Sequence, residues 1–202
     1  MRIQRSISAF LLLVIFVSGC SIFRTIENVS RLKYKIQNAS DYKVAGISVG
    51  DKKSIKDFKA LEALKITSSV VKGTLPVTFT VYIEAKNPND GTGGYPRTDL
   101  SIESFPWRLF INDNETVTGN IGEPVFVPGK GESTIIPINI EFDIVKNVKE
   151  KNIDDIIALA LQLGGIQKST SSLKILVKPV IGTPLGNITY PDEITVVDKN
   201  FN

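Results

Sequence analysis

The chain has 202 residues, of which 42% are hydrophobic, and 24 Lys and Arg against 21 Asp and Glu give a formal charge of +3. This composition is that of a globular protein, and it excludes an intrinsically disordered, collagen-like or multi-spanning membrane protein. The chain contains no His and a single Cys. Ser-His-Asp and Cys-His catalysis, His-ligated metals, an internal disulfide and Cys-ligated zinc or iron–sulfur clusters are therefore excluded.

The first 19 residues have the layout of a secretory signal peptide. Arg2 and Arg5 precede an uncharged apolar run over residues 9–17, and the small residues Ser18 and Gly19 follow it. This run is much shorter than the roughly 20 residues that span a bilayer, so we expect no permanent transmembrane helix. Loss of both arginines would leave a charge of 22 − 21 = +1. Such a chain, without a Lys/Arg cluster, is a poor nucleic-acid binder, and we predict no nucleic-acid partner.

The single cysteine, Cys20, follows this segment directly. The sequence Val17-Ser18-Gly19-Cys20 resembles the bacterial lipobox, in which a small residue precedes a lipidated cysteine. The resemblance implies a diacylglycerol thioether at Cys20, signal cleavage between Gly19 and Cys20, and acylation of the new amino group. Two or more acyl chains anchor a protein stably, whereas one holds it weakly. The alternative is an ordinary cleaved signal with an incidental or buried thiol, and the position of a lone Cys at the signal junction favours lipidation.

The lipobox resemblance also implies a location and a domain division. We expect a mature chain held at the cell envelope by its lipid. Because Ser21 is not Asp, we expect sorting to the outer membrane if the organism is Gram-negative. Residues 21–30 show no strong hydrophobic period. We therefore predict a signal peptide over residues 1–19, a lipidated tether over residues 20–30 and a single domain over residues 31–202.

From Arg31 onward a two-residue alternation dominates, which is typical of strands with one buried face. In the clearest example, from Leu75 to Lys86, apolar residues alternate with Thr, Tyr, Glu and Lys. Pro88 and the glycines after it end this strand. Further strands are predicted, in chain order, at residues 31–37, 100–102, 107–111, from 117, 125–127, 136–142, 173–177 and 194–197.

Three features of this pattern carry more specific expectations. Asp113-Asn114 predicts a hairpin turn. Pro137 lacks a backbone N–H, so it predicts an edge strand or a bulge. Trp107 occupies an apolar position of its strand, so we expect its ring in the core and not on the surface as a ligand platform.

Two segments have helical periodicity. Residues 54–66 place Ile55, Phe58, Leu61 and Leu64 on one face behind a variant capping box. Residues 152–163 begin at a capping Asn152 and have a stronger apolar face, without the Lys and Arg of a membrane-surface helix. Many short strands separated by turns predict a mainly β protein, a β-sandwich with one or two short helices.

The order of motifs in the middle of the chain resembles a known family. The long strand closes with Asn87-Pro88-Asn89, and a strand with a hairpin follows at residues 107–113. A Pro-apolar-Pro-Gly segment then precedes another strand. This order resembles the water-stress (WHy) domain of the type-2 late-embryogenesis-abundant proteins over roughly residues 70–145.

That resemblance implies an immunoglobulin- or fibronectin-III-like sandwich in a non-catalytic protein linked to desiccation or envelope stress. The insertion at residues 90–94 and the segment at residues 31–66 depart from the family pattern. The family has no catalytic residues to transfer. From the residues alone, Pro88 ends the strand ladder, and Asn87 and Asn89 can bond nearby backbone in an Asx-type turn. A ligand role for this turn is the minority alternative.

No group of side chains predicts catalysis or a metal site. Asp154 and Asp155 are adjacent and point in different directions, so they cannot form a facing pair. Residues 113–115 and Asp90 could touch Ca²⁺, but they lack the ligand spacing of an EF-hand loop. We therefore predict no catalytic residue, no metal, no cofactor and no small-molecule substrate.

Two functions of different class fit the sequence. We expect a non-catalytic, lipid-anchored envelope protein with a structural, stress-protective or weak interaction role. The alternative is a protein-binding lipoprotein of adhesin or assembly type, which holds an envelope protein through an exposed strand edge or apolar patch. An evenly polar surface favours the first function and a contiguous apolar patch the second. An enzyme would need a deep polar cleft with perturbed carboxylates, which nothing in the sequence predicts.

Overall fold

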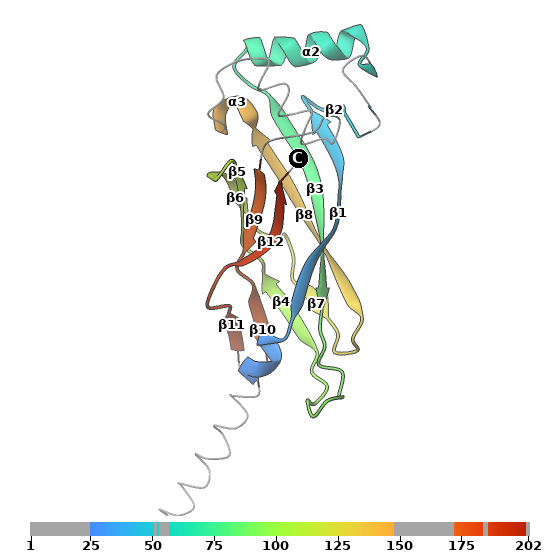
Figure 1. Cartoon of the computed structure of the whole chain (residues 1–202), viewed down its shortest axis with the longest axis vertical. Coiled ribbons are helices and arrows are strands. Elements are labelled where there is room, and N and C mark those ends of the chain that lie inside the picture. Colours follow the sequence, from blue (N-terminus) through green and yellow to red (C-terminus); the bar gives the residue numbers. More distant parts are fainter. Residues whose placement is uncertain (1–24, 51, 53–56, 148–171, 184–185, 201–202) are drawn as a thin grey trace, which may run out of the picture.

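The computed structural model of the protein describes residues 25–50, 52, 57–147, 172–183 and 186–200. In these residues, two layers of antiparallel strands face each other across one hydrophobic core (Figure 1). The prediction of a mainly β protein with a β-sandwich fold is therefore confirmed. The predicted signal peptide, Cys20 and the helix predicted at residues 152–163 lie outside the described residues.

The first layer is a four-stranded sheet in the order β2–β1–β3–β8. Its strands are β1 (Lys33–Val44), β2 (Ile47–Ser48), β3 (Pro76–Lys86) and β8 (Ser133–Asp143). Burial alternates along β3 as the sequence predicts, because every second side chain faces the core. β8 pairs with β3 without a register shift and forms the sheet edge. The edge position predicted from Pro137 is thus confirmed, since an edge strand tolerates a missing N–H on its open side.

The second layer consists of two four-stranded sheets that continue each other, in the orders β11–β10–β4–β7 and β12–β9–β5–β6. The strands are β4 (Leu100–Ser104), β5 (Trp107–Ile111), β6 (Asn114–Gly119), β7 (Val125–Val127), β9 (Ser172–Val177), β10 (Val180–Thr183), β11 (Gly186–Thr189) and β12 (Ile194–Asn200). Each position in this layer is filled by two strands that follow each other in the chain. The pairs are β4–β5, β6–β7, β9–β10 and β11–β12.

Prolines explain why this layer is divided. One proline lies in each of the four interruptions: Pro106, Pro124, Pro179 and Pro191. A proline has no N–H to donate to a ladder, so prolines at the same level of neighbouring strands break the sheet there. Isolated backbone hydrogen bonds connect neighbouring strands at the break. Lys178 N donates to Pro106 O at 2.9 Å, and Tyr190 N donates to Pro179 O at 3.0 Å.

If each interrupted pair is treated as one long strand, the sandwich has seven long strands. The first, second and fifth form one layer, and the third, fourth, sixth and seventh form the other. This arrangement is consistent with the immunoglobulin- or fibronectin-III-like sandwich that the family resemblance implies. Trp107 is 4% exposed, as predicted for a core residue, and its ring lies against Gly119 of the neighbouring β6, where a side chain would not fit.

The hairpin between β5 and β6 turns one residue earlier than predicted. Ile111 pairs with Asn114, so the two-residue loop is Asn112-Asp113 and not Asp113-Asn114. Both loop residues have positive φ angles, of 49° and 59°. This is the type I′ geometry that matches the twist of the strands, and Asn and Asp adopt it at low cost.

The first predicted helix is displaced toward the C-terminus. The structure has α2 (Ala60–Val71), which begins where Lys59 N donates to Glu62 Oε2 at 2.8 Å. Of the apolar face described in the sequence, Leu61 and Leu64 are exposed and Phe58 is partly buried, whereas Ile66 and Val70 pack into the core. The buried residues lie in the second half of the helix, close to the point where the chain continues through buried Leu75 into β3. A further short helix, α3 (Ile144–Asn147), follows β8.

The folded part of the chain also begins earlier than residue 31. Residues 25–30 are helical, and Asn28 and Val29 are 5% and 3% exposed. Val29 belongs to the hydrophobic core. The predicted tether therefore does not extend to residue 30. One and a half turns of helix contain too few apolar residues to show a period in the sequence.

Charge placed inside the sandwich should unfold it. Ile83 is 0% exposed at the centre of β3, so Ile83→Asp buries a carboxylate without a partner and should cost more than about 4 kcal/mol of unfolding free energy. Thr78→Asp is the matched control, because Thr78 lies on the outer side of the same strand. Thermal unfolding monitored by circular dichroism measures both. If Ile83→Asp melts near the wild-type temperature, this face of β3 is not core.

Candidate functional site

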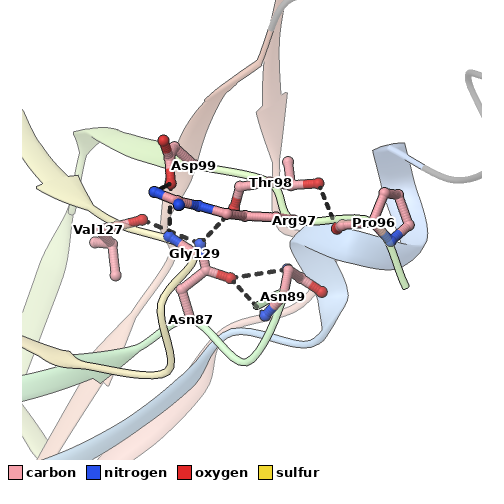
Figure 2. Close-up of polar contacts among 8 residues, drawn as sticks. All are labelled: Asn87, Asn89, Pro96, Arg97, Thr98, Asp99, Val127 and Gly129. Atoms are coloured by element: carbon pink, nitrogen blue, oxygen red, sulfur yellow. Dashed lines mark hydrogen bonds and ion pairs between the residues drawn. The ribbon is translucent and has the colours of Figure 1, made fainter. Parts of the chain in front are cut away.

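Asn87 and Asn89 lie at the end of the sandwich that receives the helical residues 25–30 (Figures 1 and 2). Both are 0% exposed, which is unusual for asparagine. They join Asn28, Arg31 and Thr98 in one hydrogen-bonded group, which we call the polar clamp. The clamp links the N-terminal helical residues 25–30 to the loops at this end of the sandwich.

The side chain of Asn87 makes four hydrogen bonds. Its Nδ2 donates to Thr98 O at 2.8 Å and to Val127 O at 3.0 Å. Its Oδ1 accepts from the backbone N–H of Asn89 at 3.1 Å and from Asn89 Nδ2 at 2.9 Å. The first of these two is the Asx turn predicted from the sequence. Figure 2 shows how this one amide holds the turn, the entry to β4 and the end of β7 together.

Asn89 connects the turn to the N-terminal segment. Its Nδ2 also donates to Asn28 O at 2.8 Å, and its Oδ1 accepts from Arg31 Nη1 at 3.0 Å. Its backbone O accepts from Thr98 N at 3.0 Å. Asn28 Nδ2 in turn donates to Thr98 Oγ1 at 3.0 Å. Residues about 60 positions apart in the chain are thus held by side-chain amides.

Two tyrosines outside the clamp, Tyr95 and Tyr190, make three further contacts with the N-terminal segment. The Arg31 guanidinium lies 3.6 Å from the centre of the Tyr95 ring, and Tyr95 Oη donates to Glu27 Oε1 at 3.0 Å. Tyr190 Oη donates to Val29 O at 2.7 Å across 161 positions of sequence. The helical residues 25–30 are therefore fixed to both layers of the sandwich.

Gly129 is required by the close packing around the clamp. A Cβ at this position would lie 2.5 Å from Asn89 O and 2.5 Å from Thr98 O, so no other residue fits without moving backbone. Its N–H donates to Asp99 Oδ1 at 2.8 Å, and Arg97 pairs with the same carboxylate at 3.6 Å. The Pro-Gly segment singled out in the sequence therefore packs directly onto the Asn-Pro-Asn turn.

Chemically, the clamp is closed. Both donors and the acceptor of each buried amide are used inside the protein, so neither Asn87 nor Asn89 has a free group for a ligand. A buried polar group that loses its partner costs about 1–3 kcal/mol. The arrangement therefore stabilises the join between the N-terminal segment and the sandwich, and it is not suited to binding a substrate.

A partly buried tyrosine pair lies beside this join. The rings of Tyr34 and Tyr190 meet edge to face at 6.2 Å, and Tyr34 also packs on Phe105 at 5.5 Å. The Tyr34 hydroxyl is buried without a hydrogen-bond partner. Burial raises the pKa of Tyr34 strongly and raises the pKa of Tyr190 to about 12.

Asp90 and residues 113–115, also singled out in the sequence, do not come together, and Asp154 and Asp155 lie outside the described residues. Asp90 accepts from the backbone N–H of Thr92 at 2.9 Å and from its Oγ1 at 2.6 Å, and these bonds lower the pKa of Asp90. Asp113 lies in the β5–β6 turn at the opposite end of the sandwich (Figure 1). Within the described ranges, no three Cys, Asp or Glu side chains are grouped to hold a metal ion.

A hollow of about 300 Å³ with a mixed polar and apolar lining lies on the outer face of the first layer. It forms where β1 bulges between Ser40 and Lys43 and its lining includes Asp41, Lys43, Thr80, Asn139 and Glu141.

Among the described residues, no helix is both long enough and apolar enough to cross a bilayer.

Comparisons with known proteins add little. Neither a protein-family model nor a curated protein sequence matches this chain. Among solved structures, the chain is similar to a protein from Archaeoglobus fulgidus, with 11% sequence identity and a TM-score of 0.34. The similarity covers 60% of this chain and 86% of that chain. A likeness this low supports no conclusion about fold or function, and the resemblance to the WHy domain stays a prediction.

Replacement of one clamp amide by a carboxylate should be costly. In Asn87→Asp an oxygen takes the place of the Nδ2 that donates to Thr98 O and Val127 O, so two bonds become repulsive contacts. We expect the free energy of unfolding, measured in a urea titration at pH 7, to fall by about 3 kcal/mol or more. Asn139→Asp is the control and should change stability by less than about 1 kcal/mol, because exposed Asn139 only accepts from Thr80 Oγ1. Equal losses of stability in both variants would show that the Asn87 amide contributes no more to stability than an exposed amide does.

The two tyrosines should respond in opposite ways to loss of the hydroxyl. Tyr34→Phe removes an unpaired buried group and should leave stability unchanged or raise it by up to about 1 kcal/mol. Tyr190→Phe removes the bond to Val29 O and should cost about 1 kcal/mol. Chemical unfolding at pH 7 measures both, and a clear loss in Tyr34→Phe would mean that its hydroxyl has a partner.

The same tyrosines should make the fold sensitive to alkali. Unfolded tyrosine ionises near pH 10, whereas the folded residues stay protonated, so the unfolded state releases protons first. Stability should therefore be complete below about pH 10 and fall as the pH rises toward 12, the pKa of Tyr190. Tyr34→Phe should reduce this slope. Melting temperatures of the wild type and of Tyr34→Phe, measured from pH 8 to 12, give this dependence of stability on pH. An equal fall in both proteins would contradict the contribution of Tyr34.

Proposed function

We propose that the chain is a non-catalytic, lipid-anchored protein of the cell envelope, held at the membrane by a lipid on Cys20. The observation that carries the proposal is the position of the single cysteine of the chain, directly after a signal-like segment and within Val17-Ser18-Gly19-Cys20. In a Gram-negative organism Ser21 favours the outer membrane. The structural or stress-protective role follows from the resemblance to the WHy domain.

The clamp supports this proposal by giving the anchor a fixed point of attachment. Only residues 21–24 separate Cys20 from the helical residues that the clamp holds. Four extended residues span at most about 14 Å. A lipid on Cys20 would therefore keep the clamp end of the sandwich close to the bilayer and direct the opposite end away from it.

A second candidate function is favoured by an apolar surface at that opposite end. Leu61, Leu64 and Val71 of α2 are 79%, 64% and 73% exposed, and α2 lies far from the N-terminal helix (Figure 1). A lipoprotein that binds a protein partner would display such a patch away from the membrane. The edge strand β8, which carries Pro137, is a poorer candidate because proline hinders strand addition.

Loss of the cysteine should remove the lipid. Cys20→Ala expressed in the native host with radiolabelled palmitate should carry no label, and Ser21→Ala should be labelled like the wild type, since it keeps the acceptor thiol. Mass spectrometry of the wild-type N-terminal peptide should show an acylated Cys20 as the first residue. Label on Cys20→Ala, or a bare thiol at this position in the native protein, would contradict the anchor.

A further inference from the structure

α2 has apolar residues on two opposite faces. Ile66 and Val70 are 5% and 6% exposed and belong to the core. Leu61, Leu64 and Val71, on the other side, are the most exposed large apolar side chains of the described residues. Among the residues that the structure describes, the core therefore covers only one of the two apolar faces of the helix.

The exposed residues have the spacing of a helix-pairing surface. Leu61, Leu64, Ser68 and Val71 follow one another at intervals of three, four and three residues. This is the repeat of a and d positions over two heptads, which places a continuous stripe on one side of a helix. We call these four residues the exposed seam, of which Leu61, Leu64 and Val71 are exposed and Ser68 is half-buried. Ser68 at its centre is small and lets another helix approach closely.

The border of the seam is positively charged. Lys65 and Lys72 occupy the two e positions beside it, and both are exposed. Neither has a carboxylate partner among the residues that the structure describes. The single acidic residue of α2, Glu62, is engaged elsewhere, by the backbone of Lys59 and by Lys52 Nζ at 3.4 Å.

From the seam and its charges, we propose that α2 binds an amphipathic helix of a partner protein, whose own apolar seam is bordered by Asp or Glu. Charges at e and g positions select the partner and its direction in paired helices. Two lysines on one border of an apolar stripe complement acidic residues on the opposing helix. The proposal gives a partner class to the protein-binding function above, and it holds whether or not Cys20 carries a lipid.

Other occupants fit the seam less well. A second copy paired in the antiparallel direction would bring Lys65 and Lys72 against the same lysines, which repel. A parallel copy would place them against the uncharged positions Ala60 and Thr67. A lipid surface is disfavoured because the exposed seam has no aromatic residue to enter the headgroup region.

A synthetic peptide tests the predicted chemistry directly. The probe is a fluorescent three-heptad peptide with Leu at a and d and Glu at e and g, and its twin has Lys at e and g. The full mature chain with Cys20→Ala avoids detergent in a fluorescence anisotropy titration. We expect the Glu peptide to bind at least ten-fold more tightly than the Lys peptide. Leu64→Ser should weaken binding at least ten-fold, and the double variant Lys65→Glu/Lys72→Glu should reverse the preference.

The variants change exposed residues, so their melting temperatures should stay within a few degrees of the parent and a loss of binding cannot be ascribed to unfolding. Absence of binding by the Glu peptide, or binding that is indifferent to Leu64→Ser and to the charge exchange, overturns the proposal. Palmitate labelling of the same variants is unaffected either way, so failure here is distinguishable from failure of the anchor.

Photo-crosslinking in the native host identifies the natural occupant. A photoreactive amino acid at position 64 of the lipidated full chain should join to another protein within a segment that has apolar residues at heptad spacing bordered by Asp or Glu. Crosslinks to a second copy, to phospholipid, or to residues 148–171 of the same chain would each overturn the proposal.

Discussion

The buried side-chain amides of Asn87 and Asn89 are the interaction on which the N-terminal end of this protein depends. Two asparagines without solvent contact satisfy the backbone of a turn, of the β4 entry and of the β7 end, and they reach back to Asn28 and Arg31. A group of this kind is stable only when every member is paired, because each unpaired amide in a low-dielectric interior is costly. The clamp therefore makes residues 25–30 part of the sandwich, and any force on the N-terminus acts on the whole domain.

A second constraint acts in the middle of the molecule. Prolines in all four strands divide the second layer, while the first layer has unbroken pairing between β3 and β8. One layer of the sandwich is thus continuous and the other is interrupted. The clamp lies at one end of the sandwich and α2 at the other (Figure 1). This separation suits a protein attached at one end and active at the other, in agreement with the function that we propose.

The sequence was informative wherever the physical signal was local. Alternation in β3 predicted a half-buried strand, and Pro137 predicted an edge position or a bulge, because both depend on a few neighbouring residues. The Asx turn at Asn87 is local too. Its other partners, Thr98, Val127 and Asn28, could not be predicted, since nothing in a single sequence links residues 40 or 60 positions apart. For a related reason the sequence could not show which face of α2 is buried. Leu61 and Leu64 have a helical period, but a period does not show whether the core or a partner covers the face.

Native-state hydrogen exchange followed by NMR tests the central claim, that the clamp is as firm as the core. The relevant amides are those of Asn89, Thr98 and Gly129, which donate to Asn87 Oδ1, Asn89 O and Asp99 Oδ1. If the claim is right, they exchange only through global unfolding, with the same free energy as Phe79 and Val81 in β3. If instead they exchange as fast as exposed Gly93 and Gly94 while β3 stays protected, the clamp does not hold the N-terminal segment to the sandwich.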